Sequence, residues 1–382
     1  MTLARHAITR LSLAALGNPP WETAAPPPRT SLPAPGDIID TLDVLVVGAG
    51  LTGLAAALAL ATSGREVTVV EHAFGAGATS RSGGVVLGDT LAGPSPLFDG
   101  CEETLRAWIA ASGIDCGLAW EGCLELRRDA SLAAQPIDWH DEEPVRFSTM
   151  VNGGVLDPAR LVAGLAAAAY RAGARIVNEV SVESFEVASP GLRLATSRGV
   201  VSARQVIMAT DAMLAISSSA TLSGSRGIKA PWDERGITVA IQTMPLEADA
   251  LAALGLKPSQ AFYTADLPLL WGRVMPDQSL LVGRELLPPA FDEPPNKLSA
   301  LVSAGGVKLL ARARGLHPAV ADIDLKRVWG GPIARTAAGF PIVTRDPDIA
   351  QMIWAGGYGG HGIAQAFRAG HLAAELAVRG VR

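Results

Sequence analysis

The stretch that decides the fold is residues 42–53, which read LDVLVVGAGLTG. Its first half, Leu42 to Val47, is an apolar, β-branched run of the kind found in strands that are buried on both faces of a parallel sheet. A G-x-G-x-x-G turn and an alanine-rich helix over 54–62 follow, and residues 66–71 form a second apolar strand. These segments predict one complete βαβ unit at the start of an α/β domain.

Each glycine of this turn has its own role. Gly48 permits the tight turn, Gly50 lets the backbone approach a pyrophosphate, and Gly53 lets the helix pack closely on the strands. The helix N-terminus offers unpaired N–H groups and a positive dipole end to the phosphates. Glu71 lies 18 positions beyond Gly53 and would accept hydrogen bonds from ribose hydroxyls. The unit therefore predicts a bound dinucleotide, but it does not distinguish FAD from NAD.

Two further loops are rich in small residues. Residues 75–84 read GAGATSRSGG, in which Arg81 stands among residues that let the chain run close to a planar ligand. Residues 357–362 read GYGGHG and open a helix that we expect to run through Val378. The first loop would supply backbone N–H donors and one cation, and the second would aim a helix N-terminus at developing negative charge.

The length of 382 residues suggests two or three domains. Segments with the strand–glycine–helix pattern form a predicted nucleotide-binding domain at 41–90, 151–225 and 328–382. Within it, Asp157 and Pro158 predict the start of a helix, and residues 180–187 and 192–196 predict a hairpin that turns around residues 189–191. Segments with short alternating runs, such as Ile237 to Ile241, form a predicted second domain with a mainly antiparallel sheet at 91–150 and 226–327. Residues 1–40 are rich in proline and would form an extended arm. The predicted fold class is therefore α/β, and α+β overall, with a discontinuous Rossmann-like domain and an inserted antiparallel domain.

Composition excludes several classes of protein. Apolar residues make up 49% and charged residues 18%, which excludes disorder over most of the chain. The net charge is −5 and no basic run occurs, so nucleic acid is not an expected partner. The longest apolar stretch, Leu54 to Ala61, is too short to span a membrane. The three cysteines fit neither a disulfide framework nor a metal site. We expect a cytoplasmic protein without a metal, and the sequence leaves its oligomeric state open.

The chain resembles the FAD-dependent amine and amino-acid oxidoreductases of the D-amino-acid oxidase superfamily, in particular the gamma-glutamylputrescine oxidase-like branch, with glycine oxidase and sarcosine oxidase as relatives. The resemblance rests on motifs that occur in the family's order: Trp21, Asp43 to Gly53, Gly77 to Gly84, Gly154 to Pro158, Val328 to Gly331, Gly339 to Pro341 and Gly360 to Gly362. It implies a two-domain fold, one tightly bound FAD, and oxidation of the C–N bond of a primary or secondary amine. In the family's reaction a hydride passes to flavin N5, the imine hydrolyses, and O2 or another acceptor reoxidises the flavin.

Two departures from the family's pattern refine this expectation. Relatives with covalent FAD carry a cysteine near Trp329 to Phe340, and none stands there, so the resemblance implies non-covalent FAD. Where related enzymes place an arginine that clamps a substrate carboxylate, this chain has Ile333, and the nearest guanidinium is Arg335. This favours an amine substrate over an α-amino acid. An α-amino-acid oxidase or dehydrogenase that uses Arg335 stays an alternative, as does a non-enzymatic flavin-binding subunit of an electron-transfer complex.

The candidate site residues follow from the motifs and the resemblance. The expected catalytic residues are His361 and Arg335, and the expected substrate pocket contains Tyr263, Trp271, Trp329 and Tyr358. The expected cofactor contacts are Gly48, Gly50, Leu51, Thr52, Gly53, Glu71, His72, Thr79, Ser80, Arg81, Gly83, Gly84, Val182, Thr210, Gly331, Gly357, Gly359, Gly360, His361, Gly362 and Ile363. Asp211 stands where the family has asparagine in an Ala-Thr-Asn stretch. Arg273 and Arg284 lie on or beside strands of the second domain; a surface position is favoured for both, with a position that faces the site as the alternative.

Overall fold

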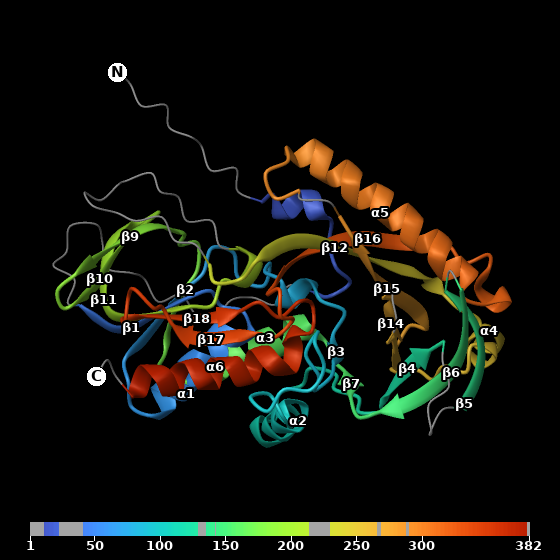
Figure 1. Ribbon diagram of the computed structural model, residues 1–382, viewed down its shortest axis with the longest axis horizontal. Coiled ribbons are helices and arrows are strands. Elements are labelled where there is room, and N and C mark those ends of the chain that lie inside the picture. Colours follow the sequence, from blue (N-terminus) through green and yellow to red (C-terminus); the bar gives the residue numbers. More distant parts are fainter. Residues whose placement is uncertain are drawn as a thin grey trace.

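The computed structural model describes residues 11–22, 41–128, 135–141, 143–213, 230–265, 269–287 and 290–379. Two large sheets lie next to each other along the long axis of the molecule (Figure 1). The first sheet is largely parallel and has helices on one face, and the second is mainly antiparallel. The predicted fold class is confirmed.

The first sheet is built around the predicted βαβ unit. Its strands β18, β11, β1, β2 and β8 are parallel and lie in this order, and β17 pairs antiparallel with β18 at the edge. Their bounds are β1 (Leu42–Val47), β2 (Val67–Val70), β8 (Arg175–Val177), β11 (Gly199–Met208), β17 (Ile342–Arg345) and β18 (Met352–Gly356). All of β1 except Asp43 is buried, as expected for a strand that is covered on both faces.

Helices α1 (Leu51–Thr62), α3 (Pro158–Arg171) and α6 (Gly362–Val378) cover one face of this sheet (Figure 1). Alanine-rich surfaces let α1 and α6 approach closely, and a Cβ at Gly370 of α6 would overlap with the backbone of α1. The predicted start of α3 is confirmed, because Asp157 Oδ1 accepts hydrogen bonds from the Ala159 and Arg160 amides at 2.9 and 3.1 Å.

The opposite face of the sheet carries the predicted hairpin. Strands β9 (Val182–Ala188) and β10 (Gly191–Thr196) are antiparallel to each other, and β10 pairs with β11. Phe185 and Leu194 of the hairpin pack with Leu45, Met208 and Trp354 of the sheet in a separate buried cluster. The parallel sheet is therefore covered on both faces, which its apolar strands require.

The second sheet has the strand order β16, β12, β15, β14, β13, β4, β6, β5. Its neighbours are antiparallel except β13 and β4, which are parallel. The strand bounds are β4 (Cys123–Arg127), β5 (Gln135–Asp141), β6 (Glu143–Val151), β12 (Glu234–Pro245), β13 (Ala261–Thr264), β14 (Trp271–Val274), β15 (Ser279–Leu286) and β16 (Leu325–Arg335). The long helix α5 (Pro295–Gly315) lies across this sheet, and the short α4 (Ala248–Ala253) lies at its far end (Figure 1).

Two of the predicted domain boundaries do not match the sheets. Strand β16 belongs to the second sheet, so a boundary at residue 328 cuts through a strand that pairs with β12 along its length. Helix α2 (Cys101–Ser112) was expected in the second domain, but Cys101, Leu105 and Ile109 pack in the same core as α1 and α6. Sequence patterns did not show this, because both assignments depend on contacts between distant segments. A small two-stranded sheet of β3 (Val85–Val86) and β7 (Gly154–Val155) lies between the two parts.

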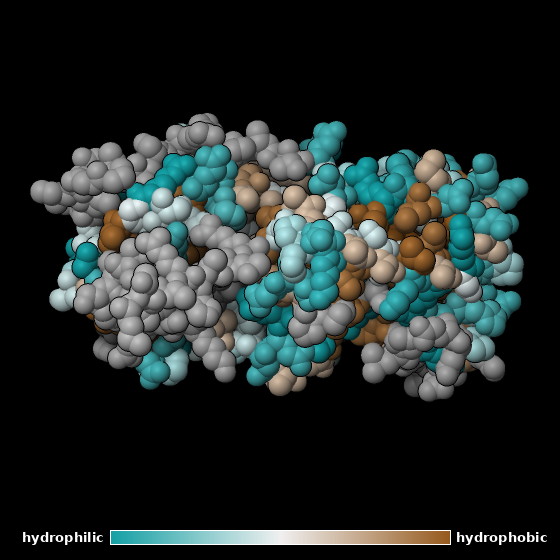
Figure 2. All heavy atoms as spheres, turned by 90° about the horizontal axis from the view of Figure 1, so that it is seen from above, coloured by the Kyte–Doolittle hydropathy of each residue, from teal (hydrophilic) through white to brown (hydrophobic). Residues whose placement is uncertain are grey.

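Part of the predicted arm is described, and it packs on the second sheet. The short helix η1 (Leu13–Leu16) lies beside α5, and Leu16 is fully buried (Figure 1). The face of the molecule that carries α5 mixes hydrophobic and hydrophilic residues (Figure 2). Within the described ranges, no helix combines the length and the apolar character that crossing a bilayer requires.

Candidate active site

A cavity of about 730 Å³ lies where the two sheets meet, which is within the usual size of small-molecule sites. One end is lined by the turn after β1, by the end of β2 and by His72 and Val182. The other end is lined by strands β12 to β16 and by the loop before α6. The predicted glycine loops and the predicted aromatic residues thus share one space.

The turn after β1 has the geometry that a pyrophosphate site needs. Gly48 has φ +108°, and a Cβ there would lie 2.7 Å from the Ala209 carbonyl oxygen. A Cβ at Gly53 would overlap with the Gly48 carbonyl, so this glycine allows α1 to start directly on the turn. Gly53 itself does not line the cavity, which corrects its prediction as a direct contact but agrees with its packing role.

Glu71 and His72 follow β2 at the same end of the cavity. The Glu71 carboxylate accepts hydrogen bonds from the Ala49 amide at 2.6 Å and from the Ala73 amide at 3.0 Å. It is therefore fixed against the turn, and a carboxylate has further lone pairs for ribose hydroxyls. His72 Nδ1 lies 2.9 Å from the Ser181 hydroxyl.

Side chains from other segments hold the loop at 79–84 in place by donating hydrogen bonds to its carbonyl groups. The Trp329 indole donates to the Arg81 carbonyl at 2.9 Å, and the Trp21 indole donates to the Ser82 carbonyl at 2.9 Å. The Arg273 guanidinium donates to the carbonyls of Gly83 and Gly84 at 3.2 and 3.3 Å. Arg273 is only 3% exposed, so the expectation of a surface position was wrong.

These contacts organise the opposite side of the loop. In a trans peptide the N–H points away from the preceding carbonyl, so carbonyls that bond outward turn the Gly83 and Gly84 amides the other way. Within the described chain, neither amide has a hydrogen-bond partner, and the Ser82 and Thr210 hydroxyls are buried without one. All four residues line the cavity. Unpaired donors around a buried space suit a flavin ring, whose carbonyl oxygens and nitrogens accept hydrogen bonds.

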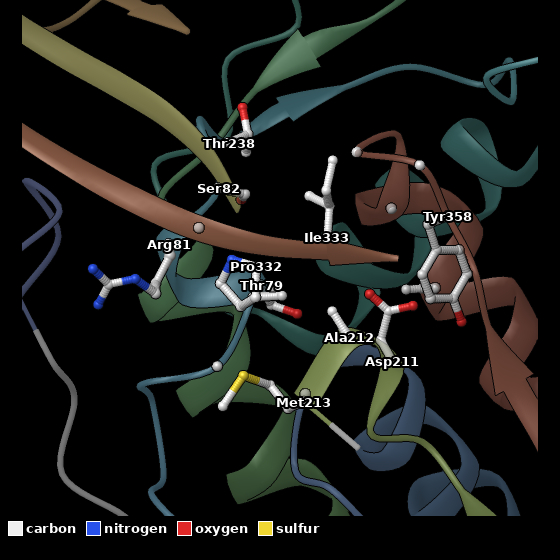
Figure 3. Close-up of a pocket in the computed structure, with 18 of the residues that line it drawn as sticks. Thr79, Arg81, Ser82, Asp211, Ala212, Met213, Thr238, Pro332, Ile333 and Tyr358 are labelled. Carbon is white, nitrogen blue, oxygen red and sulfur yellow. The ribbon is translucent and has the colours of Figure 1, made fainter. Parts of the chain in front are cut away.

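Arg81 is placed differently from the expectation. Its guanidinium donates to the Gly330 carbonyl at 2.6 Å, to the Leu16 carbonyl at 3.0 Å, and to the Gly17 carbonyl. Figure 3 shows the side chain extending away from Thr79 and Pro332. Burial lowers the pKa of Arg81 to about 10, which still leaves it charged at neutral pH. Any contact of Arg81 with a cofactor therefore has to come from its backbone.

The strands of the second sheet present alternate residues to the cavity. Thr238 and Ala240 of β12 lie opposite Gly331 and Trp329 of β16, and Ile333 is two residues further along β16. These five residues line the cavity, together with Tyr263 and Trp271 of β13 and β14. Figure 3 shows Thr238 and Ile333 in this wall. In the sequence, the alternation of residues along β12 and β16 is the pattern that indicates this wall.

Trp271 has a fixed place in this wall. A Cβ at Gly83 or at Gly283 of β15 would overlap with the Trp271 ring, so the indole lies in close contact with both glycines. It therefore connects the 79–84 loop to the second sheet. Tyr263, on the neighbouring strand, donates its hydroxyl to Glu125 at 2.7 Å.

His361 and Arg335, the two predicted catalytic residues, both line the cavity. Burial and the nearby Arg284 lower the pKa of His361 to about 4, so its imidazole is neutral at neutral pH. Its Nδ1 atom is buried and has no hydrogen-bond partner in the described chain. Arg335 is bound to Glu234 through two of its nitrogens, with Nε at 2.7 Å. The Arg335 guanidinium is therefore already paired with a carboxylate of the protein.

Tyr358 and Asp211 lie beside each other, and both line the cavity (Figure 3). The Tyr358 hydroxyl and the Thr52 hydroxyl are 2.6 Å apart, which joins the loop before α6 to α1. Asp211 accepts a hydrogen bond from the Gly357 amide at 2.7 Å. Tyr358 is thereby connected to the dinucleotide side of the cavity, and its role in the substrate pocket stays a prediction.

Residues 43–376 match the family model described as FAD dependent oxidoreductase. The chain belongs to this family. It is 28% identical to gamma-glutamylputrescine oxidoreductase of Escherichia coli (strain K12) over 90% of this chain and 86% of that protein. It is 22% identical to glycine oxidase of Bacillus licheniformis over 87% and 92% of the two chains. The solved structure of glycine oxidase from Geobacillus kaustophilus has the same fold, with a TM-score of 0.70 at 20% identity over 89% of this chain and 95% of that one.

FAD is therefore the cofactor of this protein, and the cavity fits it. The residues that would hold it are those of the turn after β1, Glu71, and the unpaired donors at 82–84 and Thr210. Of the other predicted contacts, Leu51, Thr52, His72, Thr79, Val182, Gly331, Gly359, Gly360, Gly362 and Ile363 line the cavity. Ser80 and Gly357 do not line it: the Ser80 side chain is buried, and the Gly357 amide donates a hydrogen bond to Asp211.

The three cysteines lie away from this site. Cys101, Cys116 and Cys123 are buried, and none of them lines the cavity. Burial raises the pKa of the Cys101 thiol to about 12 and that of the Cys116 thiol to about 11, so both stay protonated. Non-covalent binding of FAD stays a prediction.

Proposed function

We propose that this FAD-dependent oxidoreductase oxidises the C–N bond of a primary or secondary amine. When bound, FAD would take up the hydride that leaves the amine-bearing carbon, and the imine would then hydrolyse to a carbonyl compound and ammonia or a smaller amine. The observation that carries the proposal is the composition of the wall opposite the dinucleotide end. It presents aromatic and aliphatic side chains and a neutral imidazole beside Arg284 and the paired Arg335.

An amine has to lose its proton before the C–N bond can be oxidised, because the protonated nitrogen has no free electron pair. His361 supports this requirement, since its neutral imidazole adds no charge and its buried Nδ1 is available for a hydrogen bond. Ring faces of Trp271 and Tyr263 would attract the amine before it is deprotonated. The buried wall would also exclude water from the reacting carbon.

Ile333 and Arg335 support an amine substrate over an α-amino acid whose carboxylate is bound by an arginine at the position of Ile333. Ile333 faces the cavity with an apolar side chain, and Arg335 is paired with Glu234. An α-amino-acid oxidase stays the second candidate, because Arg284 also lines the cavity and has no such partner among the residues that the structure describes. Reoxidation by O2 is part of the proposal.

The proposal is tested by mixing the FAD-loaded protein, without oxygen, with a panel of primary amines, secondary amines, N-methyl amino acids and D-amino acids. We expect at least one amine to bleach the visible flavin absorbance within seconds to minutes and to yield a carbonyl product. Admission of air should then restore the absorbance and release hydrogen peroxide. Bleaching by α-amino acids alone would favour the second candidate. A flavin that no member of the panel reduces would overturn the proposed activity.

The role of oxygen has its own outcome. A protein that amines reduce but that air reoxidises only slowly, while an artificial electron acceptor reoxidises it fast, would be a dehydrogenase. An unreactive protein that exchanges electrons with a partner flavoprotein would instead match the non-enzymatic subunit.

A further inference from the structure

Strand β15 carries an irregularity at Arg284. Gly283 lies opposite Ala240 of β12 and Glu285 lies opposite Val239, so two consecutive residues of β12 face three residues of β15. Arg284 is the extra residue of this β-bulge. Its φ is +130°, a backbone conformation that is largely reserved for glycine.

The bulge changes which face of the sheet Arg284 reaches. Gly283 lies on the face of β15 that is turned toward the cavity, because it contacts the Trp271 ring and lies opposite Ala240, and both of these residues line the cavity. In a regular strand the next residue would point to the other face. Arg284 nevertheless lines the cavity, so the bulge brings a cation to a wall that the strand's alternation would have kept neutral.

Arg284 has no counter-ion in the described chain. It is partly buried, and neither a hydrogen bond nor an ion pair joins its side chain to any residue that the structure describes. The other arginines of this region are all engaged, Arg273 by loop carbonyls, Arg312 by Asp141 and Arg335 by Glu234. Burial, together with Arg335 and Arg312, lowers the pKa of Arg284, which means that its surroundings disfavour the charge. A strained backbone and an uncompensated cation both cost stability and point to a bound anion.

We propose that Arg284 binds a carboxylate of the substrate. This inference rests on the proposed function and narrows it to amines that also carry an anionic group. His361 is close enough for Arg284 to influence its protonation, so the subsite adjoins an unpaired imidazole nitrogen. A guanidinium can donate two parallel hydrogen bonds to a carboxylate, which fixes orientation as well as affinity. Arg284 would thus determine specificity from β15, whereas the resemblance to the family implies a carboxylate-binding arginine on β16.

The test uses FAD-loaded protein and two pairs of probes that differ in charge but not in shape, benzoate with benzamide and propionate with propionamide. Binding is measured by isothermal titration calorimetry, which requires no turnover. We expect each carboxylate to bind more tightly than its amide. In Arg284→Gln the dissociation constants of the carboxylates should rise about 10- to 100-fold, and those of the amides should change by less than about threefold. Arg284→Lys should retain part of the preference.

Arg335→Gln is the matched control, because it removes a neighbouring guanidinium that is already paired. It should leave the preference for carboxylates intact. Arg284→Gly tests the strain separately: it should raise the midpoint temperature of unfolding, because glycine adopts this φ freely, while abolishing the preference. The inference is overturned if the unmodified protein binds both members of each pair equally, or if Arg335→Gln rather than Arg284→Gln removes the preference.

A role of Arg284 toward the cofactor is a separate outcome. In that case Arg284→Gln would release FAD more readily and leave the ratio of carboxylate to amide affinity unchanged, which would also overturn the inference. The proposed activity can fail independently. If the protein binds carboxylates through Arg284 but no amine reduces its flavin, the proposed carboxylate subsite would stand and the proposed activity would be wrong.

Discussion

Asp211 shows how one residue joins the end of β11 to the loop before α6. It follows β11, has φ +44°, and accepts a hydrogen bond from the Gly357 amide in the loop before α6. It lines the cavity beside Tyr358 (Figure 3). Burial raises the pKa of Asp211 to about 6, and the backbone amides around it oppose this shift only in part. The charged carboxylate is thus disfavoured in the folded protein.

The consequence is a stability that depends on pH. The pKa of Asp211 is higher in the folded than in the unfolded chain, so its contribution is present below about pH 4 and is lost as the pH rises through about 6. Asp211→Asn keeps an oxygen for the Gly357 amide and removes the charge. We expect it to raise the free energy of unfolding at about pH 8 by up to about 3 kcal/mol, and by almost nothing near pH 4.

Chemical denaturation of the two proteins at several pH values measures this difference. A gain that is the same at all pH values would show that the charge of Asp211 is not its cause. A loss of stability at about pH 8 would mean that the amides hold the carboxylate more strongly than burial disfavours it.

At the scale of the elements, the contact between Trp271 and two glycines connects the cofactor loop to the substrate wall. Gly83 lies in the loop at 79–84, and Gly283 lies on β15. A Cβ at Gly283 would overlap with the indole ring, and a rigid ring can yield only by moving as a whole. We expect Gly283→Ala to destabilise the protein by about 1–3 kcal/mol and to weaken the binding of FAD.

Two comparisons make this prediction specific. Gly315→Ala, at the end of α5 where a Cβ meets no atom within 4 Å, should leave FAD binding unchanged. In a Trp271→Leu background the cost of Gly283→Ala should fall by more than half, because the ring that the Cβ meets is gone. Equal costs in both backgrounds would contradict the contact as the cause. Unfolding midpoints and FAD titrations supply the numbers.

The elements that the sequence predicts well are those that local patterns determine. The βαβ unit, the helix that begins at Pro158 and the hairpin around residues 189–191 each follow from capping, turn or periodicity signals within a few residues. The glycine turn was likewise placed correctly, since Gly48 needs its positive φ and Gly53 its close approach.

The parts that escaped prediction depend on pairings between distant segments. The membership of β16 in the second sheet requires β12, about 90 residues earlier, as its partner. The roles of Arg81 and Arg273 depend on which carbonyls a distant loop presents, and both were expected elsewhere. Arg284 reaches the cavity only because a bulge turns it to that face of the sheet, and no residue pattern in β15 predicts the bulge.

At the scale of the whole molecule, Arg81 joins the cofactor loop to the N-terminal segment and to the second sheet. It lies on the cofactor loop and donates to the carbonyls of Leu16 and Gly17 next to η1 and of Gly330 in β16. It is only 7% exposed, so its replacement by an apolar side chain removes three buried or partly buried hydrogen bonds to carbonyl groups. We expect Arg81→Leu to destabilise the protein by about 2–4 kcal/mol and to expose the chain near residue 17 to proteases.

Limited proteolysis followed by mass spectrometry of the fragments checks this prediction. Arg198→Leu is the control, since it removes an exposed guanidinium that pairs with Glu179 and should cost less than about 1 kcal/mol. Arg81→Leu protein that resists cleavage near residue 17 as well as the unmodified protein does would show that η1 is held by its apolar contacts with α5 alone.

The central claim is that one cavity holds FAD at one end and an amine at the other, so that each bound flavin oxidises one amine. The most direct measurement is a single turnover without oxygen, in which FAD-loaded protein is mixed with excess amine and the carbonyl product is counted against the flavin. We predict one carbonyl compound and one ammonia or smaller amine for each FAD that loses its visible absorbance. Flavin that bleaches without a carbonyl product, or a carbonyl product that forms while the flavin stays oxidised, would contradict the account.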